Sequence, residues 1–205
     1  MSHPSVLLLI AHPELRFSRI NLRLMQAARR ASHVAVRDLY ALYPDYVIDV
    51  AAEQAACEQA DLIVWAHPVH WYGMPPLMKL WLDEVLTLGW AYGGDPAAGQ
   101  RLRGKDLWAV LSTGGTEEAY RPTGYNRYFF DAFLPPYEQT AALCGLRFLP
   151  PLILHGAHHA SEAELAQHEE VFIERLNTYP DWPEMAELAD CPTCQVPTLD
   201  RPQEA

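Results

Sequence analysis

Residues 61–88 read DLIVWAHPVHWYGMPPLMKLWLDEVLTL, and this stretch decides the fold. It opens with the apolar run 62–66, which is typical of a strand buried on both faces in a parallel sheet. His67 and Pro68 end the run, and a loop follows. From Pro76 the apolar residues recur at helical spacing, and a proline suits the first helical turn. Because open α/β sheets bind ligands at the carboxyl ends of their strands, we expect a ligand at this loop.

The loop after this strand offers flat aromatic side chains and free backbone N–H groups. Its members are Val69, His70, Trp71 and Tyr72. One alternative is that Trp71 and Tyr72 merely plug the core. We favour exposure, because Gly73 and the prolines that follow it form a turn, and turns usually carry their side chains at the surface.

The composition favours a single domain. A chain of 205 residues with 50% hydrophobic composition can bury one sizeable core. It contains no apolar run near the ~20 residues that span a bilayer, and its start lacks the pattern of a signal peptide, so we expect a cytoplasmic protein. The net charge of −11 disfavours binding to nucleic acid and to anionic membranes.

A second apolar strand, Val6 to Ala11, also leads into a loop and a helix. Ser18 is placed to cap the helix expected over 19–30, whose first-turn N–H groups and dipole favour an anion. Ser18, Asn21 and His12 would add side-chain donors. A plain cap role for Ser18 and a structural role for His12 remain alternatives. Neither the GxGxxG nor the GxxxxGK[ST] fingerprint is present.

A third strand, 106–112, is followed at once by Thr113, Gly114, Gly115 and Thr116. Small residues let backbone amides approach a flat ring closely. Three loops of this kind at one edge of the sheet indicate a ligand site more specifically than any one of them does. Strands expected over 33–39 and 152–155, with helices over 51–60, 137–144 and 161–176, complete a doubly wound parallel sheet.

Three further segments have less certain patterns. Residues 117–136 are an aromatic-rich insertion, which would pack as a lid, line a pocket or form an oligomer contact. The glycine-rich residues 89–105 predict a mobile surface loop near the site. His155, His158 and His159 lack a matching carboxylate or cysteine pair, so we do not expect a metal site.

The last residues differ from the rest in composition, because the chain becomes proline-rich and acidic from Tyr179. Cys191 and Cys194 form a CxxC there, but a structural zinc site needs four ligands and only one such pair is present. We interpret this region as a flexible tail. A labile disulfide and a shared metal are the alternatives.

The three loops together resemble the flavodoxin-fold family of NAD(P)H:quinone reductases. The matching stretches are AHPELRFSRIN (11–21), HPVHWYGMPPLMKLWLDEV (67–85) and STGG (112–115). Within that family the likeness is closest to the ancillary subunits of glutathione-regulated potassium-efflux systems, through DLYALYPDYVIDVAAEQ (38–54) and CGLRFLPP (144–151). The resemblance implies a flavodoxin-like, doubly wound α/β sandwich with a five-stranded parallel sheet in the order 2-1-3-4-5. A flavin-binding domain would span residues 1–178, and the tail would span 179–205.

The resemblance also implies which residues hold a flavin, with FMN favoured over FAD because the short chain has no adenosine-binding extension. The flavin phosphate would be held by His12, Ser18, Arg19, Ile20 and Asn21. The ring would be supported by Val69, His70, Trp71 and Tyr72, and its pyrimidine edge would meet Ser112, Thr113, Gly114 and Gly115. Tyr120 matches a family tyrosine that serves catalysis. Asn126 stands where many members carry a histidine. Negative charge on the reduced flavin is therefore compensated more weakly, or Arg121 compensates it instead.

The activity implied is a two-electron ping-pong hydride transfer from NAD(P)H through FMN to a quinone or similar electrophile, in a homodimer with its site at the interface. A second hypothesis is a flavin-binding regulatory subunit with little turnover, held at the inner membrane by a potassium-efflux protein. A third is a one-electron flavodoxin carrier, which fits the acidic composition but not the aromatic insertion.

Overall fold

The computed structural model describes residues 4–93, 100–186 and 188, in which strands alternate with helices. The strands are β1 (Val6–Ile10), β2 (Val34–Asp38), β3 (Leu62–Pro68), β4 (Asp106–Ser112) and β5 (Arg147–Leu154). The α-helices are α1 (Arg19–Ala28), α2 (Leu39–Leu42), α3 (Val50–Gln59), α4 (Pro76–Val85), α5 (Pro135–Cys144) and α6 (Glu162–Thr178). Short 3-10 turns are η1 (Leu15–Phe17), η2 (Glu117–Tyr120), η3 (Phe130–Phe133) and η4 (Pro183–Ala186).

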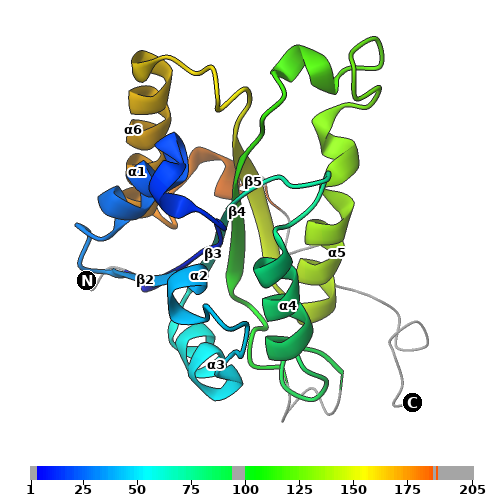
Figure 1. Ribbon diagram of the computed structural model, residues 1–205. Coiled ribbons are helices and arrows are strands. Elements are labelled where there is room, and N and C mark those ends of the chain that lie inside the picture. The colour runs from blue at the N-terminus through cyan, green and yellow to red at the C-terminus, as the bar shows by residue number, and fades with distance from the viewer. Residues whose placement is uncertain (1–3, 94–99, 187, 189–205) are drawn as a thin grey trace.

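The strands form one parallel sheet in the order β2-β1-β3-β4-β5, which confirms the predicted flavodoxin-like topology. Figure 1 shows α1 and α6 on one face of the sheet and α3, α4 and α5 on the other. The crossover from β1 to β2 runs in one direction along the sheet, and the later crossovers run in the other. The loops after β1 and β3 therefore diverge, and this switch in direction opens a crevice at the carboxyl edge.

The core is divided in two by the sheet. Leu7, Leu9 and Trp65 belong to the cluster under α3, α4 and α5, whereas Leu8 and Val64 belong to the cluster under α1 and α6. Successive side chains of a strand point to opposite faces, so a strand covered on both sides must be apolar at every position. This requirement explains the uninterrupted apolar runs from which the strands were predicted.

Strand β5 is longer than predicted, because it begins at Arg147 rather than Leu152. Pro150 and Pro151 argued against a strand in this segment. However, β5 lies at the edge of the sheet, and its outer side has no neighbouring strand. A proline there, which has no N–H to donate, therefore costs the sheet no hydrogen bond. Arg147 is also held at the start of the strand by a bidentate ion pair with Asp106 at 2.7 and 2.8 Å.

The described residues of the glycine-rich segment 89–105 do not lie near the predicted site. Its described end packs at the amino edge of the sheet, where Lys105 donates through Nζ to the carbonyl oxygens of Glu58 and Ala60. The physical reason is topological: α4 returns the chain to the amino edge, and β4 must start there. The prediction that residues 89–105 lie close to the ligand loops is therefore wrong for the described residues; residues 94–99 lie outside them.

A buried polar network ties β2, α3 and α4 together, and the sequence did not reveal it. The Glu53 carboxylate is fully buried. It accepts hydrogen bonds from Arg37 Nε at 2.8 Å and Trp81 Nε1 at 2.9 Å, and from the Tyr43 hydroxyl. A buried carboxylate is tolerated only when it is paired and hydrogen-bonded, as it is here.

The packed core continues past the expected domain end at residue 178. Tyr179 is buried and donates from its hydroxyl to Asp106 Oδ2 at 2.7 Å. Trp182 is also buried, with its ring 5.0 Å from that of Trp108. Cys191 and Cys194, and with them the CxxC prediction, lie outside the described residues.

Candidate functional site

Loops after β1, β3 and β4 converge at the carboxyl edge on a cleft of about 390 Å³. Residues of these loops and of the segment after β5 line it: His12, Glu14, Phe17, Ser18, Arg19, Ile20, Asn21, Pro68, Val69, His70, Ser112, Thr113, Gly114, Ala157 and His158. Ten of the thirteen residues predicted to hold a cofactor are among them, and Trp71, Tyr72 and Gly115 are not. The sheet topology therefore brings together residues as far apart in the chain as His12 and His158.

Ser18 has a hydroxyl proton left over for a ligand. Its Oγ caps α1 by accepting from the backbone N–H of Asn21 at 3.1 Å, and it also accepts from Asn21 Nδ2 at 3.0 Å. These two bonds occupy both lone pairs of the hydroxyl, so its single proton is free to be donated elsewhere. Asn21 is buried, and Nδ2 also donates to Ser112 Oγ at 3.0 Å, so its side chain braces the first loop against the third.

Arg19 lines the cleft, but its charge is engaged outside it. The guanidinium donates to the carbonyl oxygen of Ala160 at 2.7 Å and to Glu162 at 2.6 Å, at the start of α6. What Arg19 and Ile20 bring to the cleft is their backbone, because helix geometry leaves the first N–H groups of α1 without an intrahelical acceptor. An anion at this end is favoured by those N–H groups and by the helix dipole.

Three histidines surround the same end of the cleft. His12 Nδ1 accepts from the backbone N–H of Glu14 at 3.1 Å, which leaves Nε2 as the proton-bearing nitrogen of the neutral ring. The pKa of His12 is lowered, first by burial and then by repulsion from His70 and His158, with Glu14 opposing. Burial also lowers the pKa of His70. The imidazoles of His12 and His70 are therefore neutral near pH 7, and a bound anion would favour their protonation.

His158 was not predicted to face the cofactor. A Cβ built at Gly114 would lie 3.4 Å from Cδ2 and 3.5 Å from Nε2 of the His158 ring, so the ring lies directly against the third loop. The sequence did contain a signal for it, since the segment after β5 must emerge at the same sheet edge as the other loops. Phe17, Glu14, Pro68 and Ala157 were missed for similar reasons.

The loop after β3 is exposed, so the interpretation of Trp71 and Tyr72 as core residues is wrong. Trp71 is 96% exposed and Tyr72 48% exposed, and their φ angles of 49° and 65° are unusual for residues with side chains. The Tyr72 ring stacks on Phe133 with 5.3 Å between centroids, and its hydroxyl lies 3.4 Å from Oδ1 of Asn126. Unusual backbone angles of this kind are often found at ligand sites.

The expectation of free N–H groups is wrong at two positions of this loop. Val69 donates its N–H to the Ser112 carbonyl at 2.8 Å, and His70 donates to the Gly73 carbonyl at 3.0 Å. Hydrogen bonds that extend the β3–β4 ladder and close the turn use these groups. Among the described residues, the N–H groups of Trp71, Tyr72, Gly114 and Gly115 donate to no backbone carbonyl.

Tyr120 and Asn126 lie beside the third loop rather than in the cleft. A Cβ at Gly115 would come within 3.3 Å of Tyr120 Cε2 and 3.6 Å of Asn126 Nδ2. Tyr120 is buried, and its ring lies 5.8 Å from that of Phe133. Burial raises the pKa of Tyr120, so its hydroxyl keeps its proton. Arg121, the alternative charged group, pairs with Glu117 at 3.6 Å.

The aromatic insertion contains both buried and exposed rings. Tyr120 and Phe130 are buried, as expected of a lid over the core. Tyr125, Tyr128 and Phe129 are 87%, 62% and 59% exposed, and Trp71 of the loop after β3 is exposed as well.

A family model described as a flavodoxin-like fold matches residues 4–176. The chain belongs to this flavodoxin-like family. A curated relative, the glutathione-regulated potassium-efflux system ancillary protein KefF of Citrobacter koseri, is 43% identical over 171 residues, which are 83% of this chain and 94% of that one.

Two solved structures are similar to this flavodoxin-like protein. General stress protein 14 of Treponema denticola, solved in complex with FMN, is 36% identical with a TM-score of 0.78, and the match covers 85% of this chain and 99% of that one. The NADPH-quinone reductase of P. pentosaceus is 26% identical with a TM-score of 0.76, over 85% of this chain and 98% of that one. The predicted relationship to quinone reductases and to potassium-efflux ancillary proteins is confirmed.

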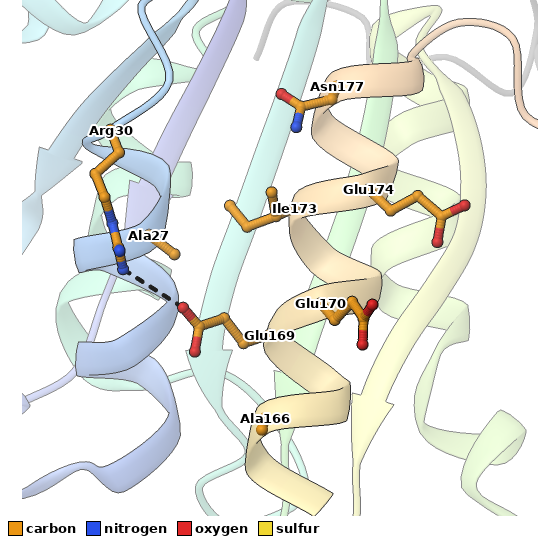
Figure 2. A pocket seen from close by; sticks show the side chains of 8 residues that line it. All are labelled: Ala27, Arg30, Ala166, Glu169, Glu170, Ile173, Glu174 and Asn177. Carbon is orange, nitrogen blue, oxygen red and sulfur yellow. Dashed lines mark hydrogen bonds and ion pairs between the residues drawn. The ribbon is translucent and has the colours of Figure 1, made fainter. Parts of the chain in front are cut away.

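A second, wider groove of about 530 Å³ lies between α1 and α6, away from the ligand loops (Figure 2). Ala27, Ala166 and Ile173 give it an apolar lining, and Arg30, just after the end of α1, pairs with Glu169 on α6 at 3.5 Å. Glu170 and Glu174 also line it, so it is acidic. Because an acidic groove repels phosphate groups, the cleft at the carboxyl edge remains the candidate site for a phosphorylated cofactor.

Over 4–93, 100–186 and 188, no three His, Cys, Asp or Glu side chains gather closely enough to hold a metal ion. No helix in that part of the chain combines the length and apolar character of a membrane span.

Proposed function

We propose that this flavodoxin-like protein is an FMN-dependent NAD(P)H oxidoreductase that reduces quinones or similar electrophiles. The observation that carries the proposal is the convergence of three loops on one cleft whose two ends differ in chemistry. One end gathers donors suited to a phosphate, and the loops beside the other end carry N–H groups that, among the described residues, donate to no backbone carbonyl.

The phosphate end fits FMN. The N–H groups of Arg19 and Ile20 and the hydroxyl proton of Ser18 are available there. His12 and His158 line the same wall. All of these are donors, and helix N-termini bind phosphate groups in this way. The FMN complex of the Treponema denticola relative supports FMN over FAD.

The ring end fits a flat, hydrogen-bonding heterocycle. Gly114 and Gly115 leave room for close approach, and the N–H groups of Trp71 and Tyr72 have no backbone acceptor among the described residues. We propose that these groups bind the polar edge of the ring and stabilise negative charge on it. When bound, FMN accepts hydride from NAD(P)H and passes two electrons to an acceptor.

The remaining groups would bind the two substrates in turn at one place, which gives ping-pong kinetics. Tyr120 keeps its proton and Asn126 lies next to the Tyr72 hydroxyl, so both would donate hydrogen bonds to the oxygens of a quinone. Asn126 carries no charge, so its donor is weaker than that of a protonated histidine. We therefore expect Tyr120 to contribute more to turnover than Asn126.

We further propose that the enzyme is a homodimer. Trp71 and Tyr125 are 96% and 87% exposed beside the cleft, and large exposed apolar patches usually mark contact surfaces. Interface cores are also enriched in aromatic residues. A second copy covering this surface would close the ring end of the cleft and exclude water from it.

The test is an absorbance spectrum of the purified protein supplied with FMN, recorded anaerobically before and after NADH or NADPH is added. We expect flavin bands that bleach with the nucleotide and recover with a quinone. Protein that takes up no FMN, or bound FMN that neither nucleotide reduces, would refute the proposal.

A regulatory role on a potassium-efflux membrane protein is the second candidate, and it would place the chain at the inner membrane. The KefF relative, an ancillary protein of such a system, favours it. So does Asn126 in place of a histidine. Its test is co-purification with such a membrane protein, compared between chains with full and empty flavin sites.

A further inference from the structure

The Thr113 hydroxyl is the centre of a small buried network at the start of the third loop. Thr113 is 1% exposed. Its Oγ1 lies 2.7 Å from the carbonyl oxygen of Gly115 and 3.0 Å from Nδ1 of His155.

Counting protons assigns the direction of each bond. A hydroxyl has one proton to donate and two lone pairs that accept. The Gly115 carbonyl has no proton, so Thr113 must donate to it. Both lone pairs of Thr113 are then available only to donors, and His155 must therefore carry a proton on Nδ1.

The segment that carries His155 also holds the loop through its backbone. Thr113 donates its N–H to Leu154 at 2.9 Å, Ala157 donates to the Thr113 carbonyl at 2.9 Å, and Gly156 donates to the Gly115 carbonyl at 2.8 Å. Because the carbonyl and N–H of a trans peptide point in opposite directions, fixing the Thr113 carbonyl toward Ala157 directs the Gly114 N–H away from β5.

We propose that His155 is a positioning residue of the flavin site: its Nδ1–H bond to Thr113 sets the orientation of the Thr113–Gly115 loop. The inference rests on the proposed function, because it concerns the loop expected to bind the flavin ring. His155 packs against Tyr120 with 5.3 Å between ring centroids and against Phe130 with 5.1 Å, so the ring has little freedom to turn away.

The protonation state agrees with this role. Burial lowers the pKa of His155, while Glu117 and Glu118 oppose the shift. The ring is therefore neutral near pH 7, with its proton on Nδ1 and an accepting lone pair on Nε2.

Two substitutions separate the hydrogen bond from simple packing. H155N keeps an N–H donor close to the position of Nδ1, whereas H155L fills similar space without a donor. H159L is the matched control, because His159 is exposed in the same segment and lies outside the cleft. The readouts are the Kd for FMN from quenching of its fluorescence, the Tm of each variant without FMN, and ¹⁵N NMR of the His155 ring.

We expect H155L to raise the FMN Kd about tenfold, the equivalent of one net hydrogen bond, while H155N and H159L stay within about threefold of the wild type. The NMR spectrum should show the proton on Nδ1. T113V should raise the Kd similarly, and the H155L/T113V double variant should be no weaker than either single variant.

An FMN Kd for H155L within about twofold of the wild type would overturn the proposal, even if its Tm falls, because the residue would then be merely structural. A proton found on Nε2 would overturn it as well. Wild-type protein that binds no FMN would refute the proposed function itself, and that result is distinct from binding that H155L leaves unchanged.

Discussion

Replacing Ser18 by aspartate should empty the phosphate end of the cleft without disturbing the fold. Asp caps helices as well as Ser does, so the N–H of Asn21 keeps its acceptor at the start of α1. What changes is the ligand end: the proton that Ser18 offers is lost and a carboxylate takes its place. S18N is the matched control, because Asn caps equally well and adds no charge.

The size of the effect follows from Coulomb's law. A phosphate bound at the α1 N-terminus would lie about 4 to 5 Å from the new carboxylate, and like charges at that distance repel by about 1 kcal/mol in water and about 4 kcal/mol at an effective dielectric constant of 20. Ser18 is only partly buried, so we expect a penalty of about 2 to 3 kcal/mol, or a Kd for FMN raised roughly 30- to 150-fold. S18N should weaken binding less than about fivefold.

The assay is titration of FMN fluorescence at low and high salt, with circular dichroism and Tm as controls for folding. The difference in FMN Kd between S18D and S18N should become smaller at high salt, because ions screen the repulsion between the carboxylate and the phosphate. Equal FMN affinity in S18D and S18N, with both variants folded, would refute the placement of the phosphate at the start of α1.

Three further predictions concern stability and assembly. E53A should lower the free energy of unfolding, measured with urea, by about 3 to 5 kcal/mol, because the donors that pair with this fully buried carboxylate lose their acceptor. A decrease of less than about 1 kcal/mol would contradict that account. His67 and His168 both have their pKa lowered by burial to about 4, so the unfolded chain binds more protons between pH 6.5 and 4. Stability should therefore fall as pH drops through that window, by up to about 3 kcal/mol for each residue, and a flat urea midpoint from pH 7 to 4.5 would count against it. W71A should leave the Tm of the monomer unchanged, because Trp71 is 96% exposed, but should weaken self-association in sedimentation experiments; a dimer of unchanged affinity would argue against the proposed interface.

The strands and the three loops were predictable because their signals are local. Five apolar residues in a row are enough to indicate a strand covered on both faces, as at β1 and β3. The cap at Ser18 is predicted from one residue before a helical pattern, and the capping box of α6 involves only Ser161 and Glu164, three positions apart. Each of these depends on neighbours within four positions of the chain.

What the sequence could not reveal depends on distant partners. Glu53 looks like an ordinary surface residue of an alanine-rich helix, and only its contacts with Arg37 on β2 and Trp81 on α4 make it a core residue. Arg19 looks like a phosphate ligand until its guanidinium is seen on Ala160 and Glu162. The direction of a long side chain is set by tertiary packing. A sequence motif therefore predicts the path of the backbone more reliably than it predicts which group each long side chain binds.

The S18D substitution also decides between the two functions proposed for this protein. It acts inside the cleft, on a partly buried side chain, and leaves the exposed aromatic surface formed by Trp71, Tyr125, Tyr128 and Phe129 unchanged. If the chain is an oxidoreductase, S18D should lose NAD(P)H oxidation in proportion to its lost FMN affinity, and added FMN should restore turnover. If the chain instead acts by docking on a membrane protein through its outer surface, S18D should still co-purify with that partner. Partner binding that is lost in S18D but retained in S18N would mean that the flavin itself sets the shape of the docking surface, which would join the two roles in one mechanism.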